Sequence, residues 1–113
     1  MGVFVKGDVV VVPFPFSDLS AAKRRPALIL TDPALDEFGD CVLAQITSQQ
    51  KGDAQAISID NSDFENGSLR YMSNVRPNKL YTASESTILY KAGDLRADKM
   101  REILSRVSRQ FTD

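Results

Sequence analysis

The sequence predicts a mainly β domain: a small, curled antiparallel barrel or half-barrel with one helix at its C-terminal end packed across it. Short runs of β-branched and aliphatic residues follow one another closely, and glycine, proline or polar clusters bound them. A helical apolar period occurs only near the end of the chain. The length of 113 residues and an apolar share of 42% suit a single domain, 1–113, around one core.

The first two predicted strands are apolar on both faces. Residues Asp8–Pro13 contain four consecutive valines, and Pro26–Thr31 is a second aliphatic run that begins with proline. Short, continuous apolar runs are typical of strands that are buried on both faces, and proline is tolerated at the first position of a strand. The polar stretch Ser17–Arg24 between them is expected to be a flexible connection.

The later predicted strands are shorter or more polar, and several alternate between apolar and polar residues. In chain order they are Asp40–Thr47, Ala56–Ile59, Ser68–Arg76, Lys79–Ala83 and Thr87–Tyr90. The polar segments Ser48–Asp53 and Asp60–Gly67 are expected to be loops. The middle of the chain is therefore dominated by strands.

The C-terminal segment is predicted to form a helix with one face on the core. Its apolar residues recur at helical spacing, at Met100, Ile103, Leu104, Val107 and Phe111. Gly93 and Asp94 precede this segment and are expected to end the last strand and to cap the helix.

Composition excludes several classes of function. The chain has no histidine and a single cysteine, Cys41, so it cannot form an internal disulfide and offers no ligand cluster for zinc or iron. The net charge is −1 and the sequence pI is about 5.4, so RNA binding would require a local basic patch. Neither a membrane-spanning run nor a signal peptide is evident, and a cytoplasmic location without membrane association is expected.

One run of three basic residues is a candidate for binding phosphate. Lys23, Arg24 and Arg25 lie where the predicted flexible connection meets the strand that begins at Pro26. Arginine presents a planar, permanently charged fork that matches a phosphate. A solvated loop tip that is basic for solubility is the alternative interpretation of the same run.

Two further segments carry groups that could contact single-stranded RNA. The stretch Gln45–Gln50 places the hydroxyls of Thr47 and Ser48 and three amides, among them that of Gln49, where a predicted strand ends, and such groups bind ribose hydroxyls, base edges or phosphate oxygens. Arg76 lies close in the sequence to Arg70, Tyr71 and Tyr81, and cations interleaved with aromatic rings can stack unpaired bases. Ordinary turn chemistry and rings packed in the core explain these residues equally well.

Three motifs in register resemble the signature of the MazF/PemK toxins. They are the strand Gly7–Val12, the Arg-Pro strand Arg24–Leu30, and the segment Ile46–Gln49, which ends a strand with Ile-Thr-x-Gln. The resemblance implies an SH3-like antiparallel barrel, usually dimeric, that cuts single-stranded RNA at selected sequences without a metal or cofactor. It also implies a cognate antitoxin protein that occupies the RNA site and so restrains growth inhibition by this mRNA interferase.

The resemblance assigns the catalytic arginine to Arg25 and the catalytic threonine to Thr47. Either Arg24 or Arg25 could act, and the position directly before Pro26 favours Arg25. Substrate binding is expected from Lys23, Arg24, Ser48, Gln49 and Arg76. In this chemistry the ribose 2′-OH attacks the neighbouring phosphorus, which gives a 2′,3′-cyclic phosphate and a 5′-OH end. Arg25 would stabilise charge on the phosphate and Thr47 would align the reacting groups, whereas no general base is evident.

Two other functions are compatible with the same fold. A non-catalytic toxin such as the gyrase-inhibiting CcdB proteins binds a protein target, but it relies on a C-terminal tryptophan, and this chain has no tryptophan. An SH3-like interaction module without toxicity is the third possibility. Neither of these would need the pair Arg25 and Thr47.

Overall fold

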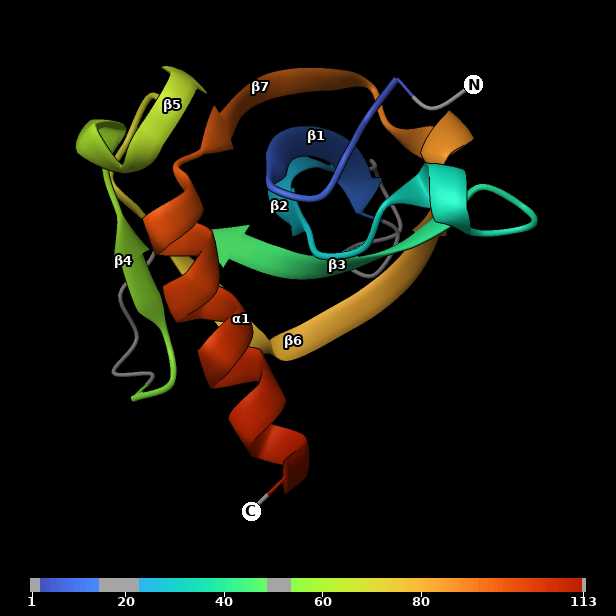
Figure 1. Ribbon diagram of the computed structural model, residues 1–113. Helices are drawn as coiled ribbons and strands as arrows, with labels where there is room; N and C mark the ends of the chain where they lie inside the picture. Colours follow the sequence, from blue (N-terminus) through green and yellow to red (C-terminus); the bar gives the residue numbers. More distant parts are fainter. Residues whose placement is uncertain (1–2, 15–22, 49–53, 113) are drawn as a thin grey trace.

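The computed structural model describes residues 3–14, 23–48 and 54–112, and it shows a curled sheet with one long helix in front of it (Figure 1). The strands are β1 (Asp8–Phe14), β2 (Lys23–Ile29), β3 (Asp40–Thr47), β4 (Ile57–Ile59), β5 (Phe64–Gly67), β6 (Ser73–Ser84) and β7 (Tyr90–Leu95). The helix α1 is Ala97–Thr112, and short 3-10 turns occupy η1 (Pro33–Leu35), η2 (Asn61–Asp63) and η3 (Glu85–Thr87).

All strand pairs in the described part of the chain are antiparallel and join into one sheet of order β4-β6-β3-β2-β1-β7-β5. Strands β1, β2 and β3 lie at its centre, and the two shortest strands, β4 and β5, lie at its edges. The sheet curls strongly around its centre, and α1 crosses one side of it (Figure 1). The predicted mainly β fold with a C-terminal helix is therefore confirmed.

Both faces of the central strands are buried, as the apolar runs predicted. Val9, Leu28 and Ile46 belong to a cluster under α1, which includes Met100 and Ile103 of the helix and is called here the helix-side cluster. The alternate residues on the other face form a far-side cluster, whose buried members are Val10, Val12, Ala27, Ile29, Cys41, Leu43 and Ile88. Alternation along each strand sends neighbouring side chains into different clusters.

Strand β6 corrects two of the predicted elements. The segments Ser68–Arg76 and Lys79–Ala83 were expected to form separate strands, but Ser73–Ser84 is one strand that passes through Pro77. Its register with β3 shifts between Ala44, opposite Leu80, and Gln45, opposite Arg76. The three residues 77–79 form a bulge there, and a bulge is where a strand tolerates proline.

Strand β5 was missed because most of its residues are polar and exposed. The segment Asp60–Gly67 was expected to be a loop, but Phe64–Gly67 pairs with β7 as an edge strand, with only Phe64 buried. The backbones approach closely there: a Cβ on Gly67, which has φ +77°, would collide with the carbonyl oxygen of Ala92. A pairing that depends on glycine leaves no hydrophobic pattern in the sequence.

The junction between β7 and α1 also differs from the expectation. The predicted strand Thr87–Tyr90 is the end of η3 followed by the start of β7, and β7 continues through Gly93 and Asp94 to Leu95. Asp94 therefore does not cap the helix; it accepts a hydrogen bond from the Asn66 amide on the neighbouring strand. Strand β7 continues beyond Gly93 because β5 pairs with it as far as Leu95.

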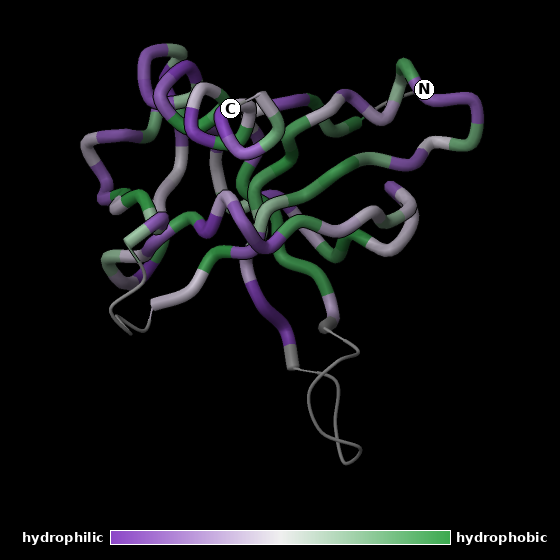
Figure 2. Tube along the Cα trace, turned by 90° about the horizontal axis from the view of Figure 1, so that it is seen from below, coloured by the Kyte–Doolittle hydropathy of each residue, from purple (hydrophilic) through white to green (hydrophobic). Residues whose placement is uncertain are grey.

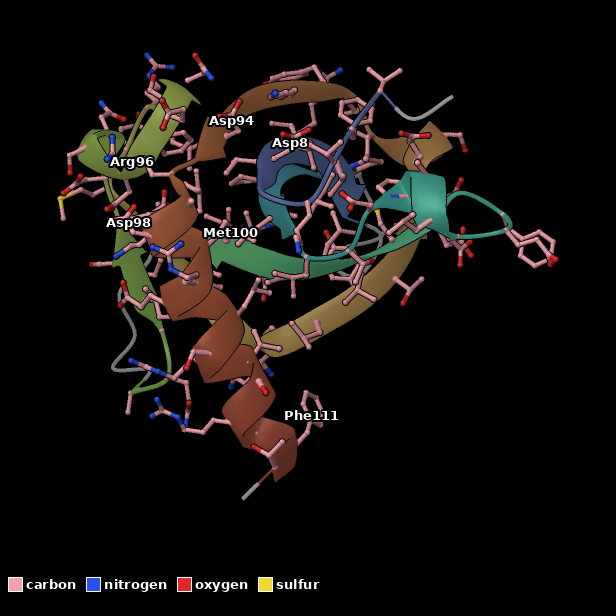
Figure 3. The ribbon with its side chains drawn as sticks, viewed as in Figure 1. Asp8, Asp94, Arg96, Asp98, Met100 and Phe111 are labelled. Carbon is pink, nitrogen blue, oxygen red and sulfur yellow. The ribbon has the colours of Figure 1, made fainter. Side chains whose placement is uncertain are left out.

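The helix packs on the sheet with most of its predicted face. Met100 and Ile103 are buried, and Leu104 and Val107 pack against the helix-side cluster. Phe111, in the last turn, is 75% exposed and projects beyond the sheet (Figure 3). The prediction that Phe111 packs on the core was wrong, because the last turn of α1 extends past the helix-side cluster.

Asp8 anchors the start of β1 to its neighbours (Figure 3). Its buried carboxylate accepts a hydrogen bond of 3.0 Å from the Val5 N–H and lies 3.3 Å from the Lys91 ammonium. Lys91 also lies 3.0 Å from Asp94, and these two carboxylates, Asp94 first, raise the pKa of Lys91. A buried carboxylate is stable when it is paired and hydrogen-bonded in this way.

Candidate functional site

The predicted catalytic arginine lies inside a strand rather than at its start. Strand β2 begins at Lys23, three residues before Pro26, and Arg25 pairs with Val12 of β1 while Arg24 pairs with Pro13. The expectation that residues 23–25 lie at a loop junction is therefore corrected. Pairing with β1 continues across the proline, which is itself in register with Val11.

The two arginines point to opposite sides of β2. Arg25 follows the same alternation as Ala27 and Ile29 of the far-side cluster, whereas Arg24 follows that of Leu28 in the helix-side cluster. Arg25 is half-buried and Arg24 is exposed. Figure 2 shows the hydrophilic start of β2 extending from the body beside the end of β1. Only Arg25 can therefore share a surface with residues on the far side of β3.

Strand β3 changes from apolar to polar along its far side. Cys41 and Leu43 are buried in the far-side cluster, and Gln45 and Thr47 continue the same alternation but are half-buried. Thr47 is the last residue of the strand, as expected. The far-side core therefore ends in an accessible amide and an accessible hydroxyl.

Arg25 and Thr47 lie on the two arms of a fork in the sheet. The pairing of β2 with β3 covers Ile29 to Ala27, the last pair being Ala27 with Gln45. Beyond that pair, β2 continues with β1, and β3 continues with β6. Each predicted catalytic residue is two positions past the last pair, on the same side of its strand. The fold thus places a guanidinium and a hydroxyl from distant sequence positions on one face.

Arg76 joins the same side from the neighbouring strand. Its register on β6 is opposite Gln45, and its Nη1 donates to Gln45 Oε1 at 3.4 Å in a partly buried setting. An amide oxygen that accepts from a guanidinium orients the cation without neutralising it. The site therefore has a second arginine beside the fork.

The remaining predicted binding residues are less constrained. Ser48 is exposed directly after β3, and Gln49 and the Lys23 side chain lie outside the part of the chain that can be described. Of the aromatic candidates, Tyr71 is 66% exposed, with the Arg70 guanidinium 5.8 Å from its ring centre. Tyr81 instead packs against the far-side cluster, where burial raises its pKa to about 12.

Two further observations concern the possible metal ligands of the described residues and the buried cysteine. Within residues 3–14, 23–48 and 54–112, no three His, Cys, Asp or Glu side chains are grouped to hold a metal ion. Cys41 is 1% exposed, and its thiol donates weakly to the Ala83 carbonyl oxygen at 3.7 Å. Burial, and then the charges of Glu85, Asp40 and Asp36, raise the pKa of Cys41 to about 11. A buried thiol of this pKa is not a nucleophile at neutral pH.

The register also adds two residues that the sequence did not single out. Asn74 lies directly opposite Thr47, and Ser58 of β4 lies directly opposite Asn74. Each is a polar residue next to β-branched neighbours, which is a common pattern for any half-exposed strand. Only the pairing of strands reveals that both lie in line with Thr47.

The chain matches the family described as PemK-like, MazF-like toxin of type II toxin-antitoxin systems over residues 5–111. No match was found among curated protein sequences. None of the helices in the described residues is long and apolar enough to cross a membrane.

Solved structures of toxins have the same fold. A MazF from Deinococcus radiodurans aligns with a TM-score of 0.76 at 19% identity, covering 98% of both chains. An endoribonuclease in complex with its cognate antitoxin from a mycobacterial species gives a TM-score of 0.73 at 15% identity, with 95% of this chain and 93% of that one covered. The toxin MazF-mt6 of Mycobacterium tuberculosis gives 0.70 at 22% identity, with 92% and 95% covered.

Proposed function

The chain belongs to the PemK-like, MazF-like toxin family, and from this membership we propose that it is the toxin of a type II toxin-antitoxin pair that acts as a metal-independent endoribonuclease. Its substrate is single-stranded RNA, which it cleaves at selected sequences. Two similar structures are those of endoribonucleases, which supports this activity. We assign this activity to a single domain, 1–113.

The observation that carries the proposal is the fork that brings Arg25 and Thr47 to one side of the sheet. The two residues are 22 positions apart in the sequence, and both are half-buried. A partly buried guanidinium is less screened by water than an exposed one and interacts more strongly with a phosphate. A toxin that acts only by binding another protein does not require this pair.

The groups at the fork suit the proposed chemistry, in which the RNA supplies its own nucleophile. The ribose 2′-oxygen forms a bond to the adjacent phosphorus and gives up its proton, while the bond from phosphorus to the next 5′-oxygen breaks and that oxygen takes a proton. The products are a 2′,3′-cyclic phosphate and a 5′-OH end. Arg25 stabilises the negative charge that grows on the phosphate oxygens, and the Thr47 hydroxyl aligns the phosphate or the 2′-OH.

Arg76 supplies a second positive charge for the RNA backbone. It is held by Gln45 on the same side of the sheet as Arg25 and Thr47. With Lys23 on β2 and with Ser48 and Gln49 after β3, it forms the substrate-binding set of this face, and Arg24 adds a cation from the opposite side of the start of β2. The net charge of −1 makes this local arrangement of cations the source of RNA affinity.

We also assign two protein partners by the same reasoning. A cognate antitoxin binds the toxin and blocks its RNA site, and a second copy of the chain completes a homodimer. Similar toxins have been solved as complexes with an antitoxin, including MazE-MazF from Deinococcus radiodurans.

The decisive experiment maps new 5′ ends by primer extension on a long unstructured RNA incubated with purified protein in EDTA. We expect discrete cuts by the wild type. Arg25→Ala lowers the cleavage rate by about 100-fold or more, as loss of an oxyanion-stabilising group does, and Thr47→Ala lowers it strongly too. Arg101→Ala on the exposed face of α1 and Thr82→Ala at the other end of β6 are the matched controls and retain activity.

Intact RNA in every lane overturns the ribonuclease proposal. Growth arrest on expression of the same protein would then favour a non-catalytic toxin that binds a protein target such as gyrase. Normal growth would favour an interaction module.

A further inference from the structure

Thr47 is the first member of a polar row that crosses three strands. The register places Asn74 of β6 directly opposite Thr47 of β3, and Ser58 of β4 directly opposite Asn74. Directly opposite residues of antiparallel strands point to the same side of the sheet. The row therefore runs from the predicted catalytic threonine to the edge of the sheet.

The burial pattern independently fixes the side on which this row lies. Ile46, Val75 and Ile57 precede or follow the row members in their strands, and all three are buried in the helix-side cluster. Thr47, Asn74 and Ser58 must then point to the far side, where Thr47 and Asn74 are half-buried and Ser58 is exposed. The row is accessible on the face that carries Arg25.

The spacing of the row suits one nucleotide next to the cleaved bond. Neighbouring strands are about 4.8 Å apart, so Asn74 is about 5 Å from Thr47 and Ser58 about 10 Å. Arg76 lies two residues beyond Asn74 on the same side of β6, about 7 Å along the strand. At this spacing, a phosphate bound at Arg76 and a base lying over Asn74 would belong to the same short stretch of RNA.

We propose that Asn74, supported by Ser58, forms a nucleotide-binding subsite beside Thr47 and selects the base next to the cleavage point. A carboxamide presents a donor and an acceptor side by side, which matches the hydrogen-bonding edge of an unpaired base. The serine hydroxyl offers a further hydrogen bond to the same nucleotide. This inference rests on the proposed ribonuclease function and assigns part of its sequence selectivity.

The test compares the cleavage pattern of the wild type with those of Asn74→Ala, Asn74→Asp and Ser58→Ala on an RNA pool randomised around one cleavage site. We expect Asn74→Ala to lower cleavage of the preferred sequence by about 10-fold or more and to flatten the preference at one position, because each bidentate contact discriminates by roughly that factor. Asn74→Asp removes the donor and shifts the preference at the same position. Ser58→Ala causes a smaller loss at that position.

Asn78→Ala is the matched control. Asn78 is an exposed amide in the same strand, within the bulge whose Pro77 carbonyl accepts a hydrogen bond from Gln110 of α1. It should leave both the rate and the preference unchanged. Thermal unfolding of each variant, compared with the wild type, identifies any loss that is merely structural, since a structural loss lowers cleavage of all sequences equally.

The outcomes separate this inference from the function on which it rests. If the wild type cleaves and Asn74→Ala keeps the same relative rates over all sequences, the base-reading role of Asn74 is wrong while the ribonuclease proposal stands. If the wild type does not cleave the pool at all, both are wrong. A changed preference at one position with normal thermal stability supports the subsite.

Discussion

At the scale of single residues, the face on which a side chain lies decides its role more than its chemical type does. Arg24 and Arg25 are adjacent and identical in chemistry, yet only Arg25 shares the far side with Thr47. Cys41 and Thr47 share a strand and a side, but Cys41 is in the core and Thr47 is accessible. Because Cys41 is buried, its thiol contributes to stability in a way that depends on pH, and it does not act as a nucleophile.

Cys41 makes stability fall at alkaline pH. Its folded pKa of about 11 lies above the ordinary value of 9.0 for a thiol, so its contribution to stability is fully present below pH 9 and is lost as the pH rises to 11, because the unfolded chain releases the proton first. We expect the difference in free energy of unfolding between wild type and Cys41→Ala to shrink by about 2–3 kcal/mol across this range. Urea unfolding at several pH values measures it, and a difference that is independent of pH would contradict it.

At the scale of elements, the pairing of the edge strand β5 with β7 depends on close backbone contact and not on apolar burial. Gly67 and Gly93 face each other in the register, and a Cβ on either would meet backbone atoms of the other strand. Such a contact holds an edge strand that contributes only Phe64 to the core. The same pairing extends β7 to Leu95, two residues before the start of α1.

Gly67→Ala tests this dependence, with Gly39→Ala as its control. Both glycines have φ +77°, but a Cβ on Gly39 has open space around it. Gly39→Ala should cost about 1–2 kcal/mol of stability, the conformational penalty alone. Gly67→Ala should cost about 1–3 kcal/mol more, because its Cβ collides with the Ala92 carbonyl. Equal losses in thermal unfolding would show that β5 does not pack as described.

At the scale of the whole molecule, an acidic chain has the two arginines of the proposed RNA site at one location. The net charge is −1, while Arg25 and Arg76 share the far side of the sheet near the fork. Few phosphates can then be contacted, and affinity should depend on salt only modestly. Of the other six arginines, Arg101, Arg106 and Arg109 lie on α1, where Arg101 and Arg109 are exposed.

The salt dependence of RNA binding measures the number of phosphate contacts. In a Thr47→Ala background, we expect Arg76→Gln to reduce the slope of log K against log salt by about 0.7, the value for one phosphate contact on a single strand. Fluorescence anisotropy with a labelled oligonucleotide reports this slope. Arg101→Gln should leave it unchanged, and an unchanged slope for Arg76→Gln would remove Arg76 from the binding surface.

Local pattern was enough to predict the central strands and the helix, whereas the candidates Arg25 and Thr47 came from the resemblance of three short motifs to a known family and stay a prediction. Four consecutive valines predict a strand that is buried on both faces, whatever its neighbours are. Met100 and Ile103 belong to a helical period that can be recognised without knowing which strands the helix packs on. The absence of histidine likewise follows from the sequence alone and excludes imidazole chemistry. These properties reside in residues that are close together along the chain.

The tertiary structure alone decided which residues share a surface. The strand β5, the continuity of β6 through Pro77, the exclusion of Arg24 from the far side and the row from Thr47 to Ser58 all depend on pairing between distant segments. A shift of one residue in that pairing would turn every side chain of a strand to its other face. Register is set by the summed packing of both clusters across the whole sheet, so no short stretch of sequence contains it.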